Sequence, residues 1–264
     1  MCLVVLSLRQ HDEYPLILAA NRDEFHARPT QDARWWPDKP DIVGGRDLQA
    51  GGTWLAVHRN GRFATVTNYR DAQPPAPENR SRGELVTGFL ESNLSPPEYL
   101  DTVDEDAYAG FNFIAGTLDD VVYLSNREEG NRVLAPGTYG LSNALLDGPW
   151  DKVERSKQKL RGLLDSKAVN ETSLLRLMND RVRGPVDEAE TGRLDFDTAH
   201  AITAPFIVQP EYGTRCTSVL LGGRNGSWYF IERRFDPRGK ATGESRFSFV
   251  ADRTSRSPHR SDSR

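Results

Sequence analysis

The chain has 264 residues, of which 37% are hydrophobic and 27% are charged, and its formal net charge is −4. This composition is that of an ordinary globular protein with one large domain or two small ones. It argues against a nucleic-acid-binding protein, which would more often gather positive charge on one face, whereas the arginines here are scattered among carboxylates.

The sequence contains no apolar run of the roughly 18 residues that a membrane-spanning helix needs. The apolar residues 1–8 lack a basic start and a small-residue cleavage site, so we interpret them as a buried strand and not as a signal peptide. Two cysteines, Cys2 and Cys216, are too few for a disulfide framework. We therefore expect a soluble, cytoplasmic protein with free thiols; a single bridge between the two cysteines is the alternative.

The first expected element is a β-hairpin. Residues 3–8 and 15–20 are apolar runs rich in strand-forming residues, and residues 9–13 between them are polar. Folding the chain about residue 12 brings Cys2 opposite residues 21–23. The pattern thus predicts a thiol beside a polar cluster at one end of a sheet.

A second hairpin is expected over residues 51–58 and 63–69. Asn60-Gly61 lies between these segments, and Asn-Gly is the strongest short-range hairpin signal. The hairpin leaves Asn68 at a strand end, roughly opposite Thr53. The prolines of residues 74–77 then indicate a loop.

The remaining elements suggest strands, then helices, then strands. We expect helices over residues 83–92, 150–164 and 172–179, a capping box at residues 95–98, hairpins over 111–125 and 214–233, and a short extended segment over 139–143. This order favours an α+β fold with antiparallel sheets and segregated helices over alternating βαβ units.

The composition changes near Asp236, where Arg, Ser, Gly and Asp begin to dominate. We therefore expect one domain over residues 1–235 and a polar tail over 236–264. Residues 247–250 are expected to dock or to add an edge strand, and the chain after Ala251 is expected to be disordered.

Cys2 is the first candidate for chemistry. The initiator methionine is usually removed when the second residue is small, which would place an α-amine and a thiol on the same residue. A free α-amine has a pKa of about 7.7 to 8 and can accept the proton of its own nucleophile. The alternative is that Cys2 is a buried apolar residue at the start of a strand.

The polar group after the second apolar run is the next candidate. Asp23 could hold the α-ammonium, and Arg22 could bind an anion or pair with Glu24. The alternative is a solvated turn whose internal ion pair contributes little.

Other residues give weaker signals. Trp35-Trp36 could line an apolar ligand site or belong to the core, and Cys216 is expected to fill the core. The histidines show no metal-ligand spacing, so no metal is predicted; one of them could ligate a haem iron, with an ordinary surface or core position as the alternative: His11, His26, His58 and His200.

A series of motifs spans about residues 1–235 in a fixed order. It comprises Met1-Cys2, Asn21-Arg22-Asp23-Glu24-Phe25, Arg28-Pro29, Trp35-Trp36, Gly44-Gly45-Arg46-Asp47, Gly51-Gly52-Thr53-Trp54-Leu55-Ala56, Thr67-Asn68-Tyr69-Arg70, Ser81-Arg82-Gly83, Gly110-Phe111-Asn112, Leu141-Ser142-Asn143 and Gly213-Thr214-Arg215. Together these motifs resemble those of the NRDE family, also called the transport-and-Golgi-organisation protein 2 family.

That family in turn is similar to the cysteine N-terminal-nucleophile amidases, which cleave bile-salt and penicillin amides. The resemblance implies a four-layer αββα sandwich of two antiparallel sheets. It implies Cys2 as nucleophile and Asp23 as the residue that binds the α-amine. The backbone N–H of Asn68 and the side-chain amide of Asn143 would bind an oxyanion, and Arg215 would lie near Cys2 and favour the thiolate.

Further residues of the same motifs are expected to line the substrate site: Asn21, Arg22, Glu24, Trp54 and Tyr69. The chain departs from the amidases at Ala20, where they have an arginine. Arg22 is offset from that position.

Two functions follow from the resemblance. The first is a hydrolase or acyl transferase that uses Cys2 to act on an amide or thioester bond of a small acyl compound, without a cofactor. The second is a non-catalytic protein on the same fold that binds and traffics haem or a lipid or acyl-CoA, since relatives have been linked to haem mobilisation and lipid homeostasis. The expected partner is accordingly a small acyl or amide molecule or haem, and not a nucleic acid.

Overall fold

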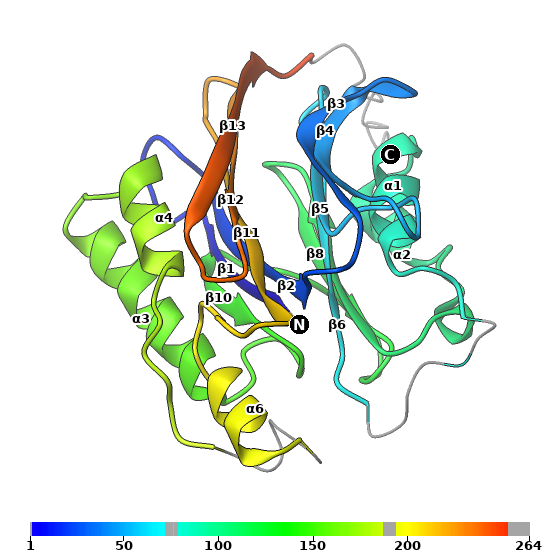
Figure 1. Ribbon diagram of the computed structural model, residues 1–264. Helices are drawn as coiled ribbons and strands as arrows, with labels where there is room; N and C mark the ends of the chain where they lie inside the picture. Colours follow the sequence, from blue (N-terminus) through cyan, green and yellow to red (C-terminus); the bar gives the residue numbers. More distant parts are fainter. Residues whose placement is uncertain (1, 72–75, 77–78, 187–193, 253–264) are drawn as a thin grey trace, which may run out of the picture.

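The computed structural model describes residues 2–71, 76, 79–186 and 194–252. Two antiparallel sheets lie face to face, and helices cover the outer face of each (Figure 1). The strands are β1 (Cys2–Leu8), β2 (Leu16–Phe25), β3 (Thr30–Trp36), β4 (Lys39–Asp47), β5 (Leu55–His58), β6 (Phe63–Asn68), β7 (Phe111–Gly116), β8 (Val121–Ser125), β9 (Asn131–Val133), β10 (Gly137–Leu141), β11 (Tyr212–Gly222), β12 (Ser227–Phe235) and β13 (Ala241–Val250).

The first sheet has the order β10-β1-β2-β11-β12-β13 and the second runs from β3 to β9 in sequence order. The helices are α1 (Gly83–Glu91), α2 (Pro96–Leu100), α3 (Asp151–Asp165), α4 (Glu171–Met178) and α6 (Phe196–Ala201), with a 3-10 turn over Glu105–Ala107. Helices α3 and α4 pack on the first sheet and α1 on the second. The protein is therefore the expected α+β, four-layer sandwich.

Side-chain alternation along the strands builds three apolar layers. In β1, Val4 and Leu6 point between the sheets, whereas Leu3 and Val5 point toward α3 and α4. A third layer, around Phe89 and Phe113, lies between the second sheet and its helices. Burial of each large apolar side chain stabilises the fold by about 1.5–3 kcal/mol, so these layers hold the two sheets in a fixed relation.

The first hairpin has the register expected from the sequence. Cys2 pairs with Arg22 across β1 and β2, and β2 pairs on its other side with β11, where Arg22 lies opposite Cys216. The second expected hairpin is also confirmed, with Gly61 in its turn at a φ of 87° that suits glycine. Cys2 consequently begins a central strand of the first sheet.

The hairpin of β3 and β4 was not predicted. Its pairing shifts between Gln31 and Arg34 and again between Trp35 and Trp36, and such bulges break the alternation that identifies a strand. Trp36 is buried in the core. Trp35 instead packs edge-on against Phe247 and Phe249 of β13.

Strand β13 is longer than the short edge strand expected over residues 247–250. It pairs with β12 from Ser227 opposite Val250 to Phe235 opposite Ala241. The expected loop prolines at 74, 75 and 77, and the expected disorder from residue 253 onward, lie outside the described residues. Within the described part of the chain, no helix is long and apolar enough to cross a membrane.

Candidate active site

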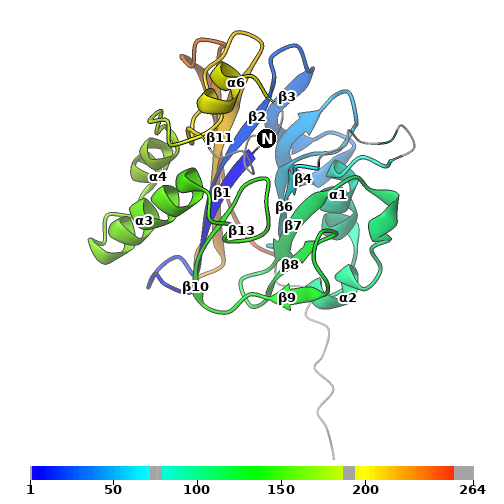
Figure 2. The same ribbon diagram turned by 90° about the horizontal axis from the view of Figure 1, so that it is seen from below.

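Cys2 lies at the first position of β1, at the end of the sandwich where the chain begins (Figure 2). Its place in the strand alternation directs the side chain between the sheets, and the residue is half-buried. Burial raises the pKa of the Cys2 thiol, the charge of Asp23 raises it further, and a hydrogen bond from the Asp23 backbone lowers it. The thiol therefore needs a base to become a nucleophile at neutral pH.

Asp23 is buried beside Cys2 on the neighbouring strand. Thr214 donates a hydrogen bond of 2.6 Å from Oγ1 to Oδ1 of Asp23, and the Tyr212 hydroxyl donates to the Asp23 carbonyl oxygen at 2.9 Å. Burial raises the pKa of the Asp23 carboxyl to about 6, and the hydrogen bond from Thr214 opposes this shift. A carboxylate fixed in this way can hold a nearby ammonium group.

Two asparagines are linked to Cys2 through Ser142. The Ser142 hydroxyl donates to the Cys2 carbonyl oxygen at 2.9 Å and also lies 3.3 Å from Oδ1 of Asn143. Nδ2 of Asn143 donates to the Asn68 carbonyl oxygen at 2.7 Å, which leaves its second hydrogen for another acceptor.

The backbone of Asn68 faces the same region. Tyr69, the next residue, donates its N–H to the carbonyl oxygen of Gly110, just before β7. By strand alternation the N–H of Asn68 therefore points away from β7. Beyond the ladders of the sheets, no described turn or loop hydrogen bond uses this N–H. Asn68 and Asn143 thus lie together at the end of the sandwich that holds Cys2.

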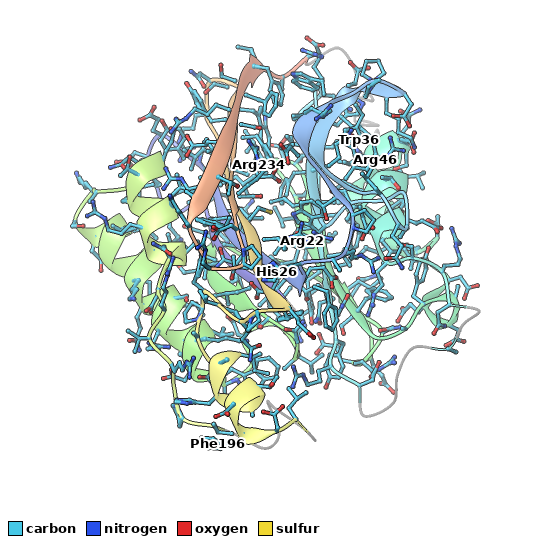
Figure 3. All side chains as sticks on the ribbon, viewed as in Figure 1. Arg22, His26, Trp36, Arg46, Phe196 and Arg234 are labelled. Atoms are coloured by element: carbon cyan, nitrogen blue, oxygen red, sulfur yellow. The ribbon has the colours of Figure 1, made fainter. Side chains whose placement is uncertain are left out.

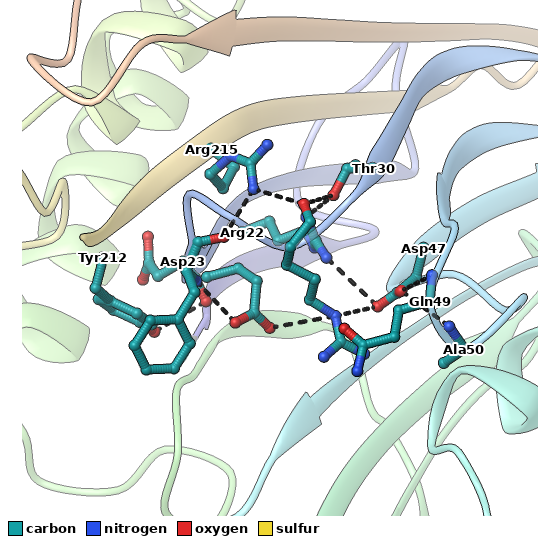
Figure 4. Close-up of polar contacts among 11 residues, drawn as sticks. Arg22, Asp23, Thr30, Asp47, Gln49, Ala50, Tyr212 and Arg215 are labelled. Atoms are coloured by element: carbon teal, nitrogen blue, oxygen red, sulfur yellow. Dashed lines mark hydrogen bonds and ion pairs between the residues drawn. The ribbon is translucent and has the colours of Figure 1, made fainter.

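Arg215 is not brought to Cys2 by any contact that the structure describes. It sits in a bulge of β11, between Thr214 and Cys216, and its Nη1 donates to the carbonyl oxygens of Phe25 at 2.8 Å and Arg28 at 3.1 Å (Figure 4). The expectation that Arg215 lowers the pKa of the Cys2 thiol is therefore not supported by its position.

Arg22 points between the sheets (Figure 3). Its guanidinium stacks 4.2 Å from the centre of the Trp54 ring, donates to Oγ1 of Thr30 at 2.8 Å, and lies 3.5 Å from the Asp47 carboxylate. Trp54 is itself buried. These contacts tie β2, the neighbour of β1, to the second sheet.

The other residues expected to bind substrate have different surroundings. Asn21 points toward the helical layer, where its Nδ2 donates to the carbonyl oxygens of Met178 and Pro205 at 2.8 Å each. Glu24 accepts a hydrogen bond from the N–H of Phe25 and is half-buried. Tyr69 is half-buried at the strand end beside Asn68. Of these three, Glu24 and Tyr69 remain accessible to a ligand.

Arg82 belongs to the motif Ser81-Arg82-Gly83, but the sequence alone did not indicate a role for it. It is half-buried at the start of α1, and its Nη1 donates to the Gly110 carbonyl oxygen at 3.0 Å. Burial lowers the pKa of Arg82, and the charge of Cys2 is the main effect opposing this shift. Arg82 therefore lies near enough to Cys2 for the charges of the two groups to interact.

The two cysteines are both free thiols. They belong to β1 and β11, which are separated by β2, so their backbones lie about 10 Å apart at a strand spacing of about 4.8 Å. That exceeds the roughly 7 Å limit for a disulfide. Among the described residues, no group of three or more His, Cys, Asp or Glu side chains is arranged to hold a metal ion.

The fold is shared with solved structures of low sequence identity. The chain is similar to mutant C2A of conjugated bile acid hydrolase from Clostridium perfringens, with a TM-score of 0.52 at 10% identity over 99% of this chain and all of that chain. A second variant of that hydrolase gives a TM-score of 0.51 at 10% identity, over 98% of this chain and all of that chain. These likenesses show an N-terminal-nucleophile-hydrolase fold.

The sequence has much closer relatives. It is 38% identical over 239 residues to the human Transport and Golgi organization protein 2 homolog, covering 83% of this chain and 86% of the human protein. It is 40% identical to the homolog from Bos taurus with the same coverage, and 30% identical to Transport and Golgi organization protein 2 of Drosophila melanogaster, over 91% of this chain and 95% of that protein. The family described as Transport and Golgi organisation 2 matches residues 1–237. The chain belongs to the Transport and Golgi organisation 2 family.

Proposed function

We propose that this protein is a cysteine N-terminal-nucleophile hydrolase or acyl transferase that acts on an amide or thioester bond of a small acyl compound. The observation that carries the proposal is the connected group at the start of β1. Ser142 joins the Cys2 backbone to Asn143, Asn143 joins Asn68, and Asp23 lies buried on the adjacent strand. The fold neighbour is named as a hydrolase of conjugated bile acid, which agrees with this reaction class.

In the proposed reaction, Met1 is first removed so that Cys2 carries the α-amine. The amine takes the thiol proton, and the sulfur forms a bond to the substrate carbonyl carbon. The second Nδ2 hydrogen of Asn143 and the N–H of Asn68 donate to the resulting oxyanion. Asp23 stabilises the α-ammonium, which then passes its proton to the departing amine or thiolate as the old bond breaks.

The acyl group is then attached to Cys2 as a thioester. Water, or a second nucleophile in a transferase, attacks this thioester and loses a proton to the α-amine, and the Cys2 thiol is restored. Every proton moves between the substrate, the attacking group and the α-amine. The raised pKa of the Cys2 thiol makes this amine necessary.

The test combines intact mass with a panel of acyl amides and acyl thioesters of increasing chain length. We expect a mass without Met1, turnover of at least one class, and a loss of at least 100-fold in Cys2→Ser. Asn143→Ala should lower kcat by about 10²–10³ because it removes an oxyanion donor. Asn68→Ala is the matched control, since it keeps the backbone N–H and should stay within a few-fold of the unaltered protein. Retention of Met1 on most molecules would exclude the reaction.

A non-catalytic role at the same site is the second candidate. It is favoured by the raised pKa of the thiol and by the half-buried position of Cys2, both of which suit a ligand-lining residue. Titrations with haemin and with a long-chain acyl thioester test it. Binding that is unchanged in Cys2→Ala, without turnover in the unaltered protein, would support a carrier of haem or an acyl compound.

A further inference from the structure

A large groove opens at the opposite end of the sandwich from Cys2. It has a volume of about 1000 Å³ and is formed where strands of both sheets end, with Arg9, Asn60, Arg62, Leu118, Arg224 and Trp228 among its lining residues. Arg9 follows the last residue of β1, so it lies about 20 Å from Cys2 along a strand that rises about 3.3 Å per residue. We call this groove the distal cleft. It is distinct from the candidate active site.

The three arginines of the distal cleft are not neutralised by described carboxylates. Arg9 donates to the carbonyl oxygens of Asp119 at 2.9 Å and Leu134 at 3.2 Å, and Arg224 donates to the carbonyl oxygen of Asp12 at 2.6 Å. These acceptors are backbone groups that carry no net charge. Elsewhere, many arginines of this chain do pair with carboxylates, as Arg127 does with Asp71 at 2.7 Å.

Arg62 is the buried member of this group. Its Nη2 donates to the Phe89 carbonyl oxygen at 3.0 Å and to Oγ of Ser92 at 3.1 Å, and its guanidinium lies 3.9 Å from the centre of the Phe89 ring. Nε is buried with no hydrogen-bond partner among the described residues. Burial lowers the pKa of Arg62 to about 10, so it remains a cation at neutral pH. A buried cation without a counter-ion is costly unless an anion binds nearby.

The other residues that line the distal cleft indicate which apolar and charged groups its ligand should carry. Trp228 is buried and lines the cleft, and no acceptor for its indole N–H occurs among the described hydrogen bonds of the chain. Pro15 and Leu118 add apolar surface. Two aspartates, Asp119 and Asp252, are exposed at the rim, which leaves three cations facing two anions. The lining therefore suits an anionic group attached to an apolar ring or chain.

We propose that the distal cleft binds a small organic anion, either a phosphate monoester or a carboxylate. Its charged group is held by Arg9, Arg62 and Arg224, and its apolar part contacts Trp228 and Leu118. Guanidinium groups recognise both phosphate and carboxylate through paired hydrogen bonds. Binding at this site does not depend on Cys2, so it stands apart from the proposed hydrolase function.

Calorimetric titration at low salt with phenyl phosphate, phenylacetate and inorganic phosphate tests the proposal. We expect at least one of the two phenyl compounds to bind, and phenyl phosphate to bind more tightly than inorganic phosphate because of its ring. The phenyl compound that binds more tightly identifies the anion. Affinity should fall as salt is added. Absence of binding by both phenyl compounds at millimolar concentration would overturn the proposal.

Variants locate the binding. The double variant Arg9→Gln with Arg224→Gln should weaken the affinity at least 10-fold, while Arg238→Gln, which removes an exposed arginine at the far end of β12, should leave it unchanged. Cys2→Ala should bind as the unaltered protein does. The described side-chain hydrogen bonds of Arg9 and Arg224 all go to backbone oxygens, so the loss of these side chains should leave the melting temperature within a few degrees. Equal weakening in Arg238→Gln would show diffuse charge attraction and refute the site.

Discussion

Asp23 differs from an ordinary carboxyl because its burial raises its pKa from 3.8 to about 6. Between these values the folded protein holds a proton that the unfolded chain has already lost. The proton-linked stability is therefore fully present below pH 3.8 and is lost as the pH rises through about 6. A shift of about two pKa units corresponds to about 3 kcal/mol.

We predict that the Asp23→Asn variant lacks this loss. Its free energy of unfolding, relative to that of the unaltered protein, should rise by about 3 kcal/mol between pH 4 and pH 7, as measured by urea denaturation at each pH. Asp197→Asn, at an exposed position of α6, is the control. Parallel pH profiles for Asp23→Asn and the unaltered protein would contradict the burial of a titrating carboxyl at residue 23.

Arg22 is predicted to contribute to stability through its contacts with Trp54, Thr30 and Asp47. Arg22→Met removes a buried cation and leaves Asp47 with Arg28 as its partner, so we expect a loss of about 2–4 kcal/mol in urea denaturation. Arg22→Lys should lose less, since it keeps the charge but not the planar stack. A loss below about 0.5 kcal/mol in Arg22→Met would mean that the two sheets do not depend on this contact.

Among the elements, β13 has one face that packs on the core and one face that is exposed to solvent. Phe249 packs against the inter-sheet layer and meets Trp35 edge-on at 5.3 Å, whereas the next residue, Val250, is exposed. Phe249→Ala should therefore lower the free energy of unfolding by about 1.5–3 kcal/mol. Val250→Ala on the same strand should cost less than about 0.5 kcal/mol. Thermal or urea denaturation of both variants measures the difference, and equal effects would contradict the assigned faces of β13.

The elements also show what the sequence could predict. The two apolar runs of β1 and β2 and the polar turn between them are enough to place Cys2 opposite residues 21–23, and the structure pairs it with Arg22. Asn60-Gly61 is enough to place Asn68 at a strand end. The strands β3 and β4 could not be predicted because their bulges interrupt alternation. The extra residue in the β11 bulge changes the face of the sheet toward which Arg215 points. The neighbours of Arg215 could therefore not be derived from its position next to Cys216 in the sequence.

The family motifs named more of the candidate site residues than the hydrophobic periodicity did. They did not show how those residues are arranged in space. Asn143 bonds Asn68 directly and is linked to Cys2 through Ser142. The contact of Ser142 with Cys2 depends on the pairing of β1 with β10, between residues about 140 positions apart. Arg82 reaches the site from the start of α1, on the other sheet. Such long-range contacts depend on the packing of whole layers and leave no local signal in the sequence.

In the whole molecule, the strands of one sandwich run between the end that holds Cys2 and the end that holds the distal cleft. If the distal cleft binds its anion only in the folded state, saturating ligand must stabilise the protein. At 100 times the dissociation constant the gain is about 2.7 kcal/mol, and it should appear as a rise in melting temperature with phenyl phosphate. The rise should be the same in Cys2→Ala. A smaller rise in that variant would mean that the two ends of the sandwich are coupled.

The central position of β1 has a consequence for biosynthesis. The strand lies between β10 and β2, and β2 pairs on its other side with β11. The pairing of β2 with β11 cannot be complete until about residue 222 has left the ribosome. At about 5–20 residues per second this takes roughly 10–45 s. During that interval the start of the nascent chain is still outside a finished sheet, within reach of an aminopeptidase. The order in which strands are synthesised thus allows the terminal amine to be exposed before its strand is enclosed.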